Sequence, residues 1–288
     1  MTTLRLVNRY EEIAHGEIKG SADRWSLSVY PKVRVADVIS LDGVGAVGEL
    51  KRFGLQAHFD FVVCKETWTP IYAVEFDGDF HSTDVQAARD AKKDELCKRA
   101  DFPILRINSR YLTNDFGKMT LLAWIMDVRE IQEEFYRIQE RGGIAADEPF
   151  DPFWLMSTTP GEDRFPYMLA GAARERLRRM SAAGRILDPC SSGFIGYDAD
   201  EVIRGMHYIR VSATEGVFVK SAMRPQFFPI LFSDLLDEIL SFQLEAEVRR
   251  WLAGEVSSTP LVDVQAEFRR LSKSLKLGQA HSYGHGPA

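Results

Sequence analysis

The sequence predicts a mixed α/β fold followed by a smaller α+β domain. Over residues 1–140, short runs rich in Val, Ile and Phe alternate with longer segments of helical periodicity, which is typical of a central sheet flanked by helices. A stretch rich in Gly, Pro and acidic residues follows at 141–153 and has the character of a linker. We therefore expect a first domain at 1–140 and a second, α+β domain at 154–288.

The order of the expected elements in the first half is helix, strands, helix, strand, helix. Helical spacing predicts helices at residues 9–18, 82–100 and 115–139. Runs of β-branched and aromatic residues predict strands at residues 25–39, 57–64, 71–77 and 103–108. The connection KETWTP between the second and third strands is short enough for a β-hairpin. In the second half, helical patterns at 169–183 and 232–253 flank an expected hairpin at 206–223.

Composition places the chain among ordinary globular proteins, with 288 residues, 45% of them hydrophobic, and a net charge of −6. The three cysteines form no CxxC pair, which excludes a zinc ribbon and a disulfide scaffold. The sequence has neither a signal-peptide pattern nor a run of about 18 apolar residues, so we expect a cytoplasmic protein without a membrane span. The negative charge argues against a general nucleic-acid binder, because phosphate binding needs clustered Lys and Arg.

The stretch IYAVEFDGDFHS, residues 71–82, places acidic residues in an apolar strand. Because alternate residues share a face, Glu75 and Asp77 lie side by side, roughly 7 Å apart, opposite an apolar face of Tyr72 and Val74. If the preceding strand pairs with this one, Asp60 lies next to both acids. Three converging carboxylates repel one another and lose hydration, and a divalent cation such as Mg²⁺ offsets both costs. The alternative is a solvated sheet face whose DGD sequence closes the strand as a turn.

Two nearby residues favour a phosphodiesterase site over that alternative. His81 directly follows the strand, and its ordinary pKa near neutrality suits a general base or a proton donor. Lys93, in RDAKKDELC, shares a helix face with Asp90 and can contact a phosphate. The simpler interpretations are a turn residue for His81 and a surface lysine for Lys93.

Four segments, FDFVV, AVEFDGDFH, RDAKKDELC and FPILRI, together resemble the PD-(D/E)XK nuclease superfamily. The branch they resemble most includes very-short-patch repair endonucleases and related bacterial domains of uncharacterised function. The resemblance covers roughly residues 9–115. It implies a restriction-endonuclease-like core and Mg²⁺-dependent hydrolysis of DNA phosphodiester bonds, with Mn²⁺ as a possible substitute.

The resemblance also implies roles for individual residues. Asp60 resembles the first metal-binding aspartate of the superfamily, and Glu75 resembles the acid of its second motif. In the superfamily pattern a lysine stands two residues after that acid, whereas here the residue is Asp77, which would assist the metal. Either His81 or Lys93 would then take the role of the missing lysine, and the sequence leaves this choice open.

Further residues would support such a site. Asp90 would orient His81 or Lys93, or simply favour the N-terminal half of its helix through the helix dipole. Arg106 lies on a predicted buried strand and needs a partner, either a carboxylate of the cluster or a DNA phosphate. Glu11 or Glu12 of the first helix would add an acid, although adjacent glutamates on a helix are usually solvated.

The function predicted from these features is a metal-dependent deoxyribonuclease in repair, restriction or defence against foreign DNA. The main alternative keeps the fold without the chemistry, as a module that binds DNA or a protein partner. A calcium-type structural site is less favoured, because the 12-residue loop ending in Glu is absent. In the second half, a basic segment is either a phosphate-tracking surface or a solvated helix face, and the apolar segment 227–242 is either core or a homo-oligomer contact. The basic residues considered for DNA contact are Arg174, Arg178, Arg179 and Arg185.

Overall fold

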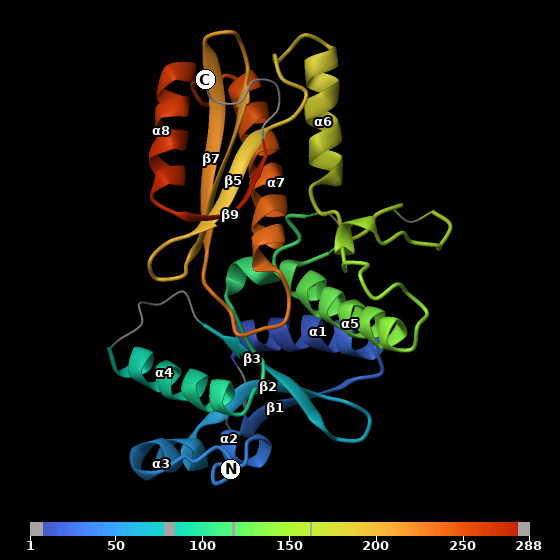
Figure 1. Cartoon of the computed structure of the whole chain (residues 1–288), viewed down its shortest axis with the longest axis vertical. Helices are drawn as coiled ribbons and strands as arrows, with labels where there is room; N and C mark the ends of the chain where they lie inside the picture. The colour runs from blue at the N-terminus through green and yellow to red at the C-terminus, as the bar shows by residue number, and fades with distance from the viewer. Residues whose placement is uncertain (1–7, 78–83, 117–118, 162, 282–288) are drawn as a thin grey trace. The chain divides into compact units, whose positions relative to one another are not determined.

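The computed structural model describes residues 8–77, 84–116, 119–161 and 163–281 (Figure 1). The chain divides into two compact units, each of which combines helices with a sheet, so the predicted α/β class is confirmed. The first unit comprises Met1–Phe150 with Gln226–Ile230, and the second comprises Asp151–Pro225 with Leu231–Ala288.

The boundary between the two units falls within the segment expected to be a linker, but the second unit is not continuous in sequence as 154–288 would be. Gln226–Ile230 returns to the first unit, because its backbone pairs with the edge of that unit's sheet. The Ile104 N–H donates to the Phe227 carbonyl at 2.8 Å, and the Arg106 N–H donates to the Gln226 side chain at 3.0 Å. This segment therefore covers a strand edge that would otherwise be open to solvent.

The first unit contains a four-stranded mixed sheet in the order β1-β2-β3-β4. Its strands are β1 (Ser28–Arg34), β2 (His58–Cys64), β3 (Pro70–Phe76) and β4 (Ile104–Ile107). β1 and β3 pair antiparallel with β2, so the expected hairpin forms, and β4 pairs parallel with β3 after the α4 crossover. The predicted strand at 25–39 is longer than the observed one, because the short helix α2 (Val35–Val38) follows β1 directly.

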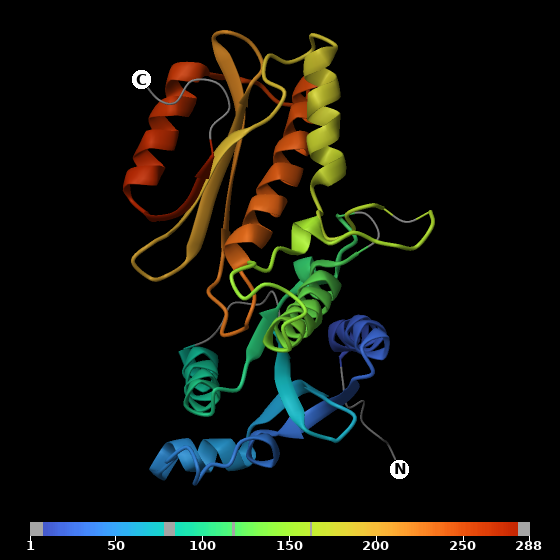
Figure 2. The same ribbon diagram turned by 45° about the vertical axis from the view of Figure 1, so that its right-hand side comes forward.

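The helices of this unit are α1 (Arg9–Arg24), α3 (Gly48–Gln56), α4 (Asp84–Arg99), the 3-10 helix η1 (Ser109–Leu112) and α5 (Leu121–Glu140). A capping box between Asn8 and Glu11 starts α1. The hydroxyl of Thr120 accepts the Ala123 N–H at 3.1 Å and starts α5 later than the predicted position 115. α1 and α5 lie side by side (Figures 1 and 2).

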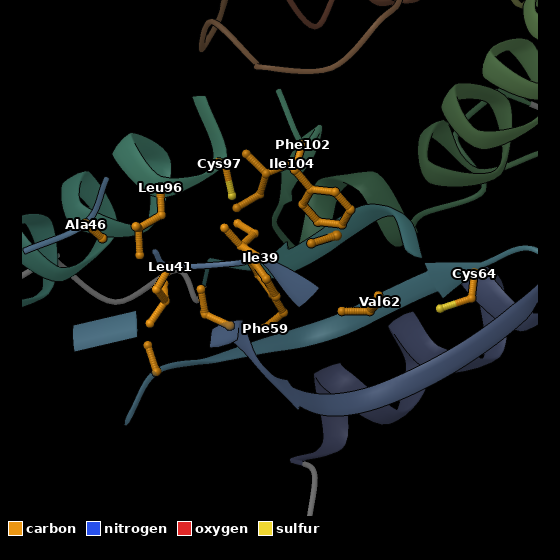
Figure 3. Close-up of a cluster of buried hydrophobic side chains, with 13 residues drawn as sticks. Ile39, Leu41, Ala46, Phe59, Val62, Cys64, Leu96, Cys97, Phe102 and Ile104 are labelled. Atoms are coloured by element: carbon orange, nitrogen blue, oxygen red, sulfur yellow. The ribbon is translucent and has the colours of Figure 1, made fainter. Parts of the chain in front are cut away.

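Helices cover both faces of this sheet. On one face, the ring of Tyr10 in α1 stacks on Phe76, with ring centroids 5.7 Å apart. On the other, Ala73 packs in a buried cluster with Cys97 of α4, which Figure 3 shows among its neighbours. The apolar face of Tyr72 and Val74 is buried as expected, and the opposite face, which carries Glu75, is covered as well. Glu75 is only 6% exposed, because its face is also covered.

The second unit has a five-stranded antiparallel sheet in the order β8-β7-β6-β5-β9. Its elements are η2 (Pro152–Trp154), α6 (Gly171–Ala182), β5 (Ser192–Tyr197), β6 (Ile203–Arg210), β7 (Glu215–Met223), α7 (Phe232–Leu252), β8 (Thr259–Pro260), α8 (Leu261–Lys273) and β9 (Lys276–His281). The expected hairpin at 206–223 is β6–β7. Phe268 of α8 packs against Phe194 and Tyr208, whereas Leu244 of α7 packs with Ile209, so the two helices cover opposite faces (Figure 2). Within the described residues, none of the helices has the length and apolar character that crossing a membrane requires.

Candidate active site

Asp60 and Glu75 are brought together by the β2–β3 hairpin. The register pairs Phe61 with Val74, which places Asp60 beside Glu75 on the neighbouring strand. The Asp60 N–H donates to Oε1 of Glu75 at 3.2 Å, and the Phe76 N–H donates to Oδ2 of Asp60 at 2.9 Å. Each carboxylate is thus held by the backbone of the strand that carries the other.

Glu75 receives its ammonium partner from α4. Nζ of Lys93 donates to Oε2 of Glu75 at 2.6 Å and to the His58 carbonyl at 2.9 Å. Burial raises the pKa of Glu75 to about 7, while the Lys93 ammonium lowers it and the charge of Asp60 raises it further. A pKa shifted in this way by burial is more common at functional sites than elsewhere in a protein.

Asp60 is paired with a residue that the sequence did not single out. Nζ of Lys32, on β1, donates to Oδ1 of Asp60 at 2.7 Å and to Oε1 of Glu11 at 3.0 Å. Glu11, one of the two acids suggested for the first helix, is held in place because its Oε2 accepts the Asn8 N–H at 2.8 Å. Asp60 thus has Glu75 on one side and the Lys32–Glu11 pair on the other.

Asp77 bonds to Arg106, whose guanidinium gathers three aspartates. Nη1 of Arg106 donates to Asp77 at 3.2 Å and to Asp90 at 3.3 Å, and Nη2 donates to Asp94 at 2.7 Å. Burial acts to lower the pKa of Arg106, but these aspartates raise it well above its usual value. Asp77 is the carboxylate of the predicted cluster that pairs with Arg106, whereas the contacts of Arg106 with Asp90 and Asp94 were not predicted. His81 itself lies outside the described residues.

The donor set of Asp60 and Glu75 fits a hard divalent cation. Mg²⁺ is commonly held by one or two carboxylates, with water completing its coordination. Each of the four oxygens of Asp60 and Glu75 accepts one of the hydrogen bonds described above, which leaves a second lone pair for a ligand. Among the described residues, no three His, Cys, Asp or Glu side chains are grouped to hold a metal ion, so the fit rests on two carboxylates.

The arginines of α6 make ion pairs within the second unit. Arg174 bonds to Oδ2 of Asp237 at 2.9 Å and to Glu238, both on α7. Arg178 and Arg179 are exposed and lie 3.8 and 3.0 Å from Glu175 on their own helix. Arg185 is exposed in the turn that follows. Contact of these four residues with DNA remains a prediction, and Arg174 would have to leave two buried or half-buried carboxylates to make it.

Sequence reasoning missed Lys32 and Asp94. Asp94 follows Asp90 by one helical turn, so both lie on the same helix face, and this spacing could have identified it. The signal for Lys32 is weaker, because the segment VYPKVR reads as an ordinary edge strand with an exposed lysine. Lys32 also has a φ of +55°, a backbone conformation that sequence patterns do not predict for a lysine in a strand.

Comparison with known proteins identifies one similar family. A family model described as a protein of unknown function (DUF2726) matches residues 4–116, which is less than half of the chain. The matched segment runs from α1 to η1 and beyond, so it contains all of the acids and lysines described above in the first unit. No curated protein and no solved structure matches the chain.

Proposed function

We propose that this chain is a metal-dependent deoxyribonuclease that hydrolyses DNA phosphodiester bonds. The observation that carries the proposal is the buried Glu75 carboxylate, fixed beside Asp60 and bonded to Lys93 at 2.6 Å. An acid pair of this kind, with an ammonium beside it, combines hard oxygen donors with a cation that controls the ionisation of the site. The resemblance of residues 9–115 to PD-(D/E)XK nucleases adds to this support.

Asp60 and Glu75 would hold Mg²⁺ or Mn²⁺. When bound, such an ion lowers the pKa of a water molecule and offsets negative charge on the phosphorus centre in the transition state. Lys93 favours the charged, metal-binding form of Glu75 against the effect of burial, and it fixes Oε2 so that the carboxylate keeps one orientation. Arg106 restrains Asp77 at the end of β3, and His81 remains a candidate proton donor or general base.

The proposal is tested by incubating the protein with supercoiled, linear and single-stranded DNA, with Mg²⁺, Mn²⁺ or EDTA. Glu75→Gln preserves the shape of the side chain and removes its charge. Because metal binding contributes several kcal/mol to the transition state, we expect cleavage to fall by about 100-fold or more. Glu66→Gln, at an exposed glutamate of the β2–β3 turn, is the matched control and should cleave normally. Full activity in Glu75→Gln would show that Glu75 is not a metal ligand.

A second candidate function is a catalytically inactive module that binds DNA or a protein partner. The observation that favours it is charge balance within the chain, since Asp60, Glu75 and Asp77 are paired with Lys32, Lys93 and Arg106. The carboxylates therefore do not need a metal to be stable together. DNA binding without cleavage, under every metal condition, would support this alternative.

The cellular setting belongs to the proposal as well. We propose that the protein acts in the cytoplasm, where the three free cysteines Cys64, Cys97 and Cys190 would stay reduced. Repair, restriction and defence against foreign DNA are the settings that the resemblance suggests. A protein partner or a second copy of the chain would then supply regulation or specificity.

A further inference from the structure

Lys32 has an unusual backbone conformation for a residue within a strand. Its φ is +55°, in the left-handed region that a lysine seldom adopts. Pairing of β1 with β2 continues on both sides, from Pro31 with Phe61 to Val33 with Phe59, so the irregular residue stands opposite Asp60. Such conformations cost free energy and cluster at active sites and ligand clamps, which makes Lys32 a candidate for a functional role.

The conformation brings the Lys32 ammonium to a point where three elements meet. Nζ lies 2.7 Å from Oδ1 of Asp60 on β2 and 3.0 Å from Oε1 of Glu11 on α1. The other carboxylate oxygen of Asp60 accepts the N–H of Phe76, the residue that follows Glu75 on β3. Asp60 therefore links the Lys32 ammonium to the strand that carries Glu75. The ammonium is thus held at the edge of the candidate active site.

Of the two lysines at this site, Lys32 is the more accessible. The side chain of Lys93 is 10% exposed, and its ammonium already serves Glu75 and the His58 carbonyl. The side chain of Lys32 is 35% exposed, whereas its partners Asp60 and Glu11 are 17% and 12% exposed. A phosphate arriving from solvent meets Lys32 without displacing the buried pair.

The Lys32 ammonium has room for a further acceptor besides its two carboxylate partners. An ammonium has three protons, and the two carboxylates take two of them. The remaining proton is available to a phosphate oxygen.

We propose that Lys32 binds a backbone phosphate of DNA at the Asp60–Glu75 site. This inference rests on the proposed function, and it assigns the phosphate contact to an accessible strand residue in place of the buried Lys93. Lys93 then acts as a positioning residue for Glu75. Lys32 would be the cation that brings a phosphodiester next to the acid pair.

The test measures DNA affinity by fluorescence anisotropy in EDTA, with a short labelled duplex over a series of KCl concentrations. Each phosphate neutralised by a protein cation contributes about 0.9 to the slope of log affinity against log salt concentration. Lys32→Asn removes the cation, and asparagine adopts a positive φ more readily than most residues. We therefore expect the magnitude of the slope to decrease by about 0.9, to the same extent for different DNA sequences. Lys32→Arg should restore the slope. The matched control is Lys65→Asn, at an exposed lysine beyond the other end of β2, and it should keep the wild-type slope.

An unchanged slope in folded Lys32→Asn would overturn the inference and leave Lys32 as a residue that only neutralises Asp60. If Lys32→Asn does not fold, Lys32→Asn/Asp60→Asn removes both charges, and its slope is compared with that of Asp60→Asn. A wild-type protein that neither binds DNA in EDTA nor cleaves it with Mg²⁺ or Mn²⁺ would overturn both this inference and the proposed function, whereas cleavage with metal but no binding in EDTA would overturn this inference alone. If the wild type cleaves DNA but Lys32→Asn keeps the wild-type slope, the inference alone is overturned. If the slope of Lys32→Asn changes but the wild type cleaves no DNA, the inference is supported and the proposed nuclease is overturned.

Discussion

Replacement of Lys93 by Met should destabilise the first unit in a strongly pH-dependent way. The substitution keeps most of the volume of the side chain and removes the ammonium that bonds to Glu75 at 2.6 Å. It leaves a carboxylate that is 6% exposed without its main counter-charge. Breaking a buried ion pair by removing one partner costs about 3–5 kcal/mol when the remaining group is charged.

The sign of the pH dependence follows from the raised pKa of Glu75. In the folded wild type this pKa is about 7, against 4.5 for an ordinary glutamate, so the folded state holds a proton that the unfolded state has already lost. The stability contributed by that proton is present below the ordinary pKa and is lost as the pH rises through about 7. Without Lys93 the pKa of Glu75 rises further, so the variant continues to lose stability above pH 7, by about 1.4 kcal/mol for each pH unit.

Urea unfolding at several pH values measures this effect. Relative to the wild type, Lys93→Met should lose about 1 kcal/mol near pH 6, where Glu75 is mostly protonated, and about 3 kcal/mol near pH 8.5. Lys92→Met is the matched control, because Lys92 is the preceding residue on α4 and makes an exposed pair with Glu49 at 3.2 Å. It should lose at most about 1 kcal/mol at either pH.

The double variant Glu75→Gln/Lys93→Met removes both charges and should abolish the extra loss at high pH. Two results would refute the reasoning: an equal loss in Lys93→Met at both pH values, or the same pH trend in Lys92→Met. Either would mean that the Glu75 carboxylate does not depend on Lys93 for its charge.

Two further predictions concern packing and charge elsewhere in the chain. Gly193→Ala would place a Cβ 2.2 Å from the buried ring of His207, so urea unfolding should show a loss of about 1–3 kcal/mol or more in the second unit. Gly20→Ala, where the new Cβ meets nothing within 4 Å on α1, should instead raise stability by about 0.5–1 kcal/mol. Arg106→Gln removes the cation shared by three aspartates that are 29–39% exposed, and we expect a loss of about 2–3 kcal/mol, reduced by added salt. A gain in stability in Arg106→Gln would contradict the charge assignment.

The parts of the fold that the sequence predicted well are those with continuous apolar patterns. The strands expected at 57–64 and 71–77 match β2 and β3 to within one residue at every end. The reason is that a long apolar run bounded by polar turn residues allows few alternative positions for a strand. α3 and β5 were missed, since GELKRFGLQ and SGFIGY contain glycines that weaken a helix or strand pattern. In β5 the glycine has a packing reason, because Gly193 stands opposite His207.

The candidate site was predictable where it depends on strand pairing and unpredictable where it depends on side-chain partners. Asp60 and Glu75 meet because a hairpin places them on neighbouring strands, and alternation plus a short turn is enough to foresee this. The partner of Arg174 was not foreseeable. Glu238 is one of several acids on α7, and only the packing of α6 on α7 shows that Arg174 bonds to Glu238 and Asp237.

The aspartate at position 77, where the superfamily pattern has a lysine, is consistent with the rest of the site. In the β3–β4 register Glu75 pairs with Arg106, and the guanidinium of Arg106 bonds to Asp77 at 3.2 Å. A lysine at this position would place an ammonium beside a buried guanidinium, and like charges so close destabilise each other. The ammonium for Glu75 must then come from another element, and Lys93 of α4 supplies it from the neighbouring helix. The strand keeps its acid because Arg106 balances it. Under the proposed nuclease function, Lys93 of α4 and His81 would be the two candidates for the role that the superfamily pattern gives to the lysine.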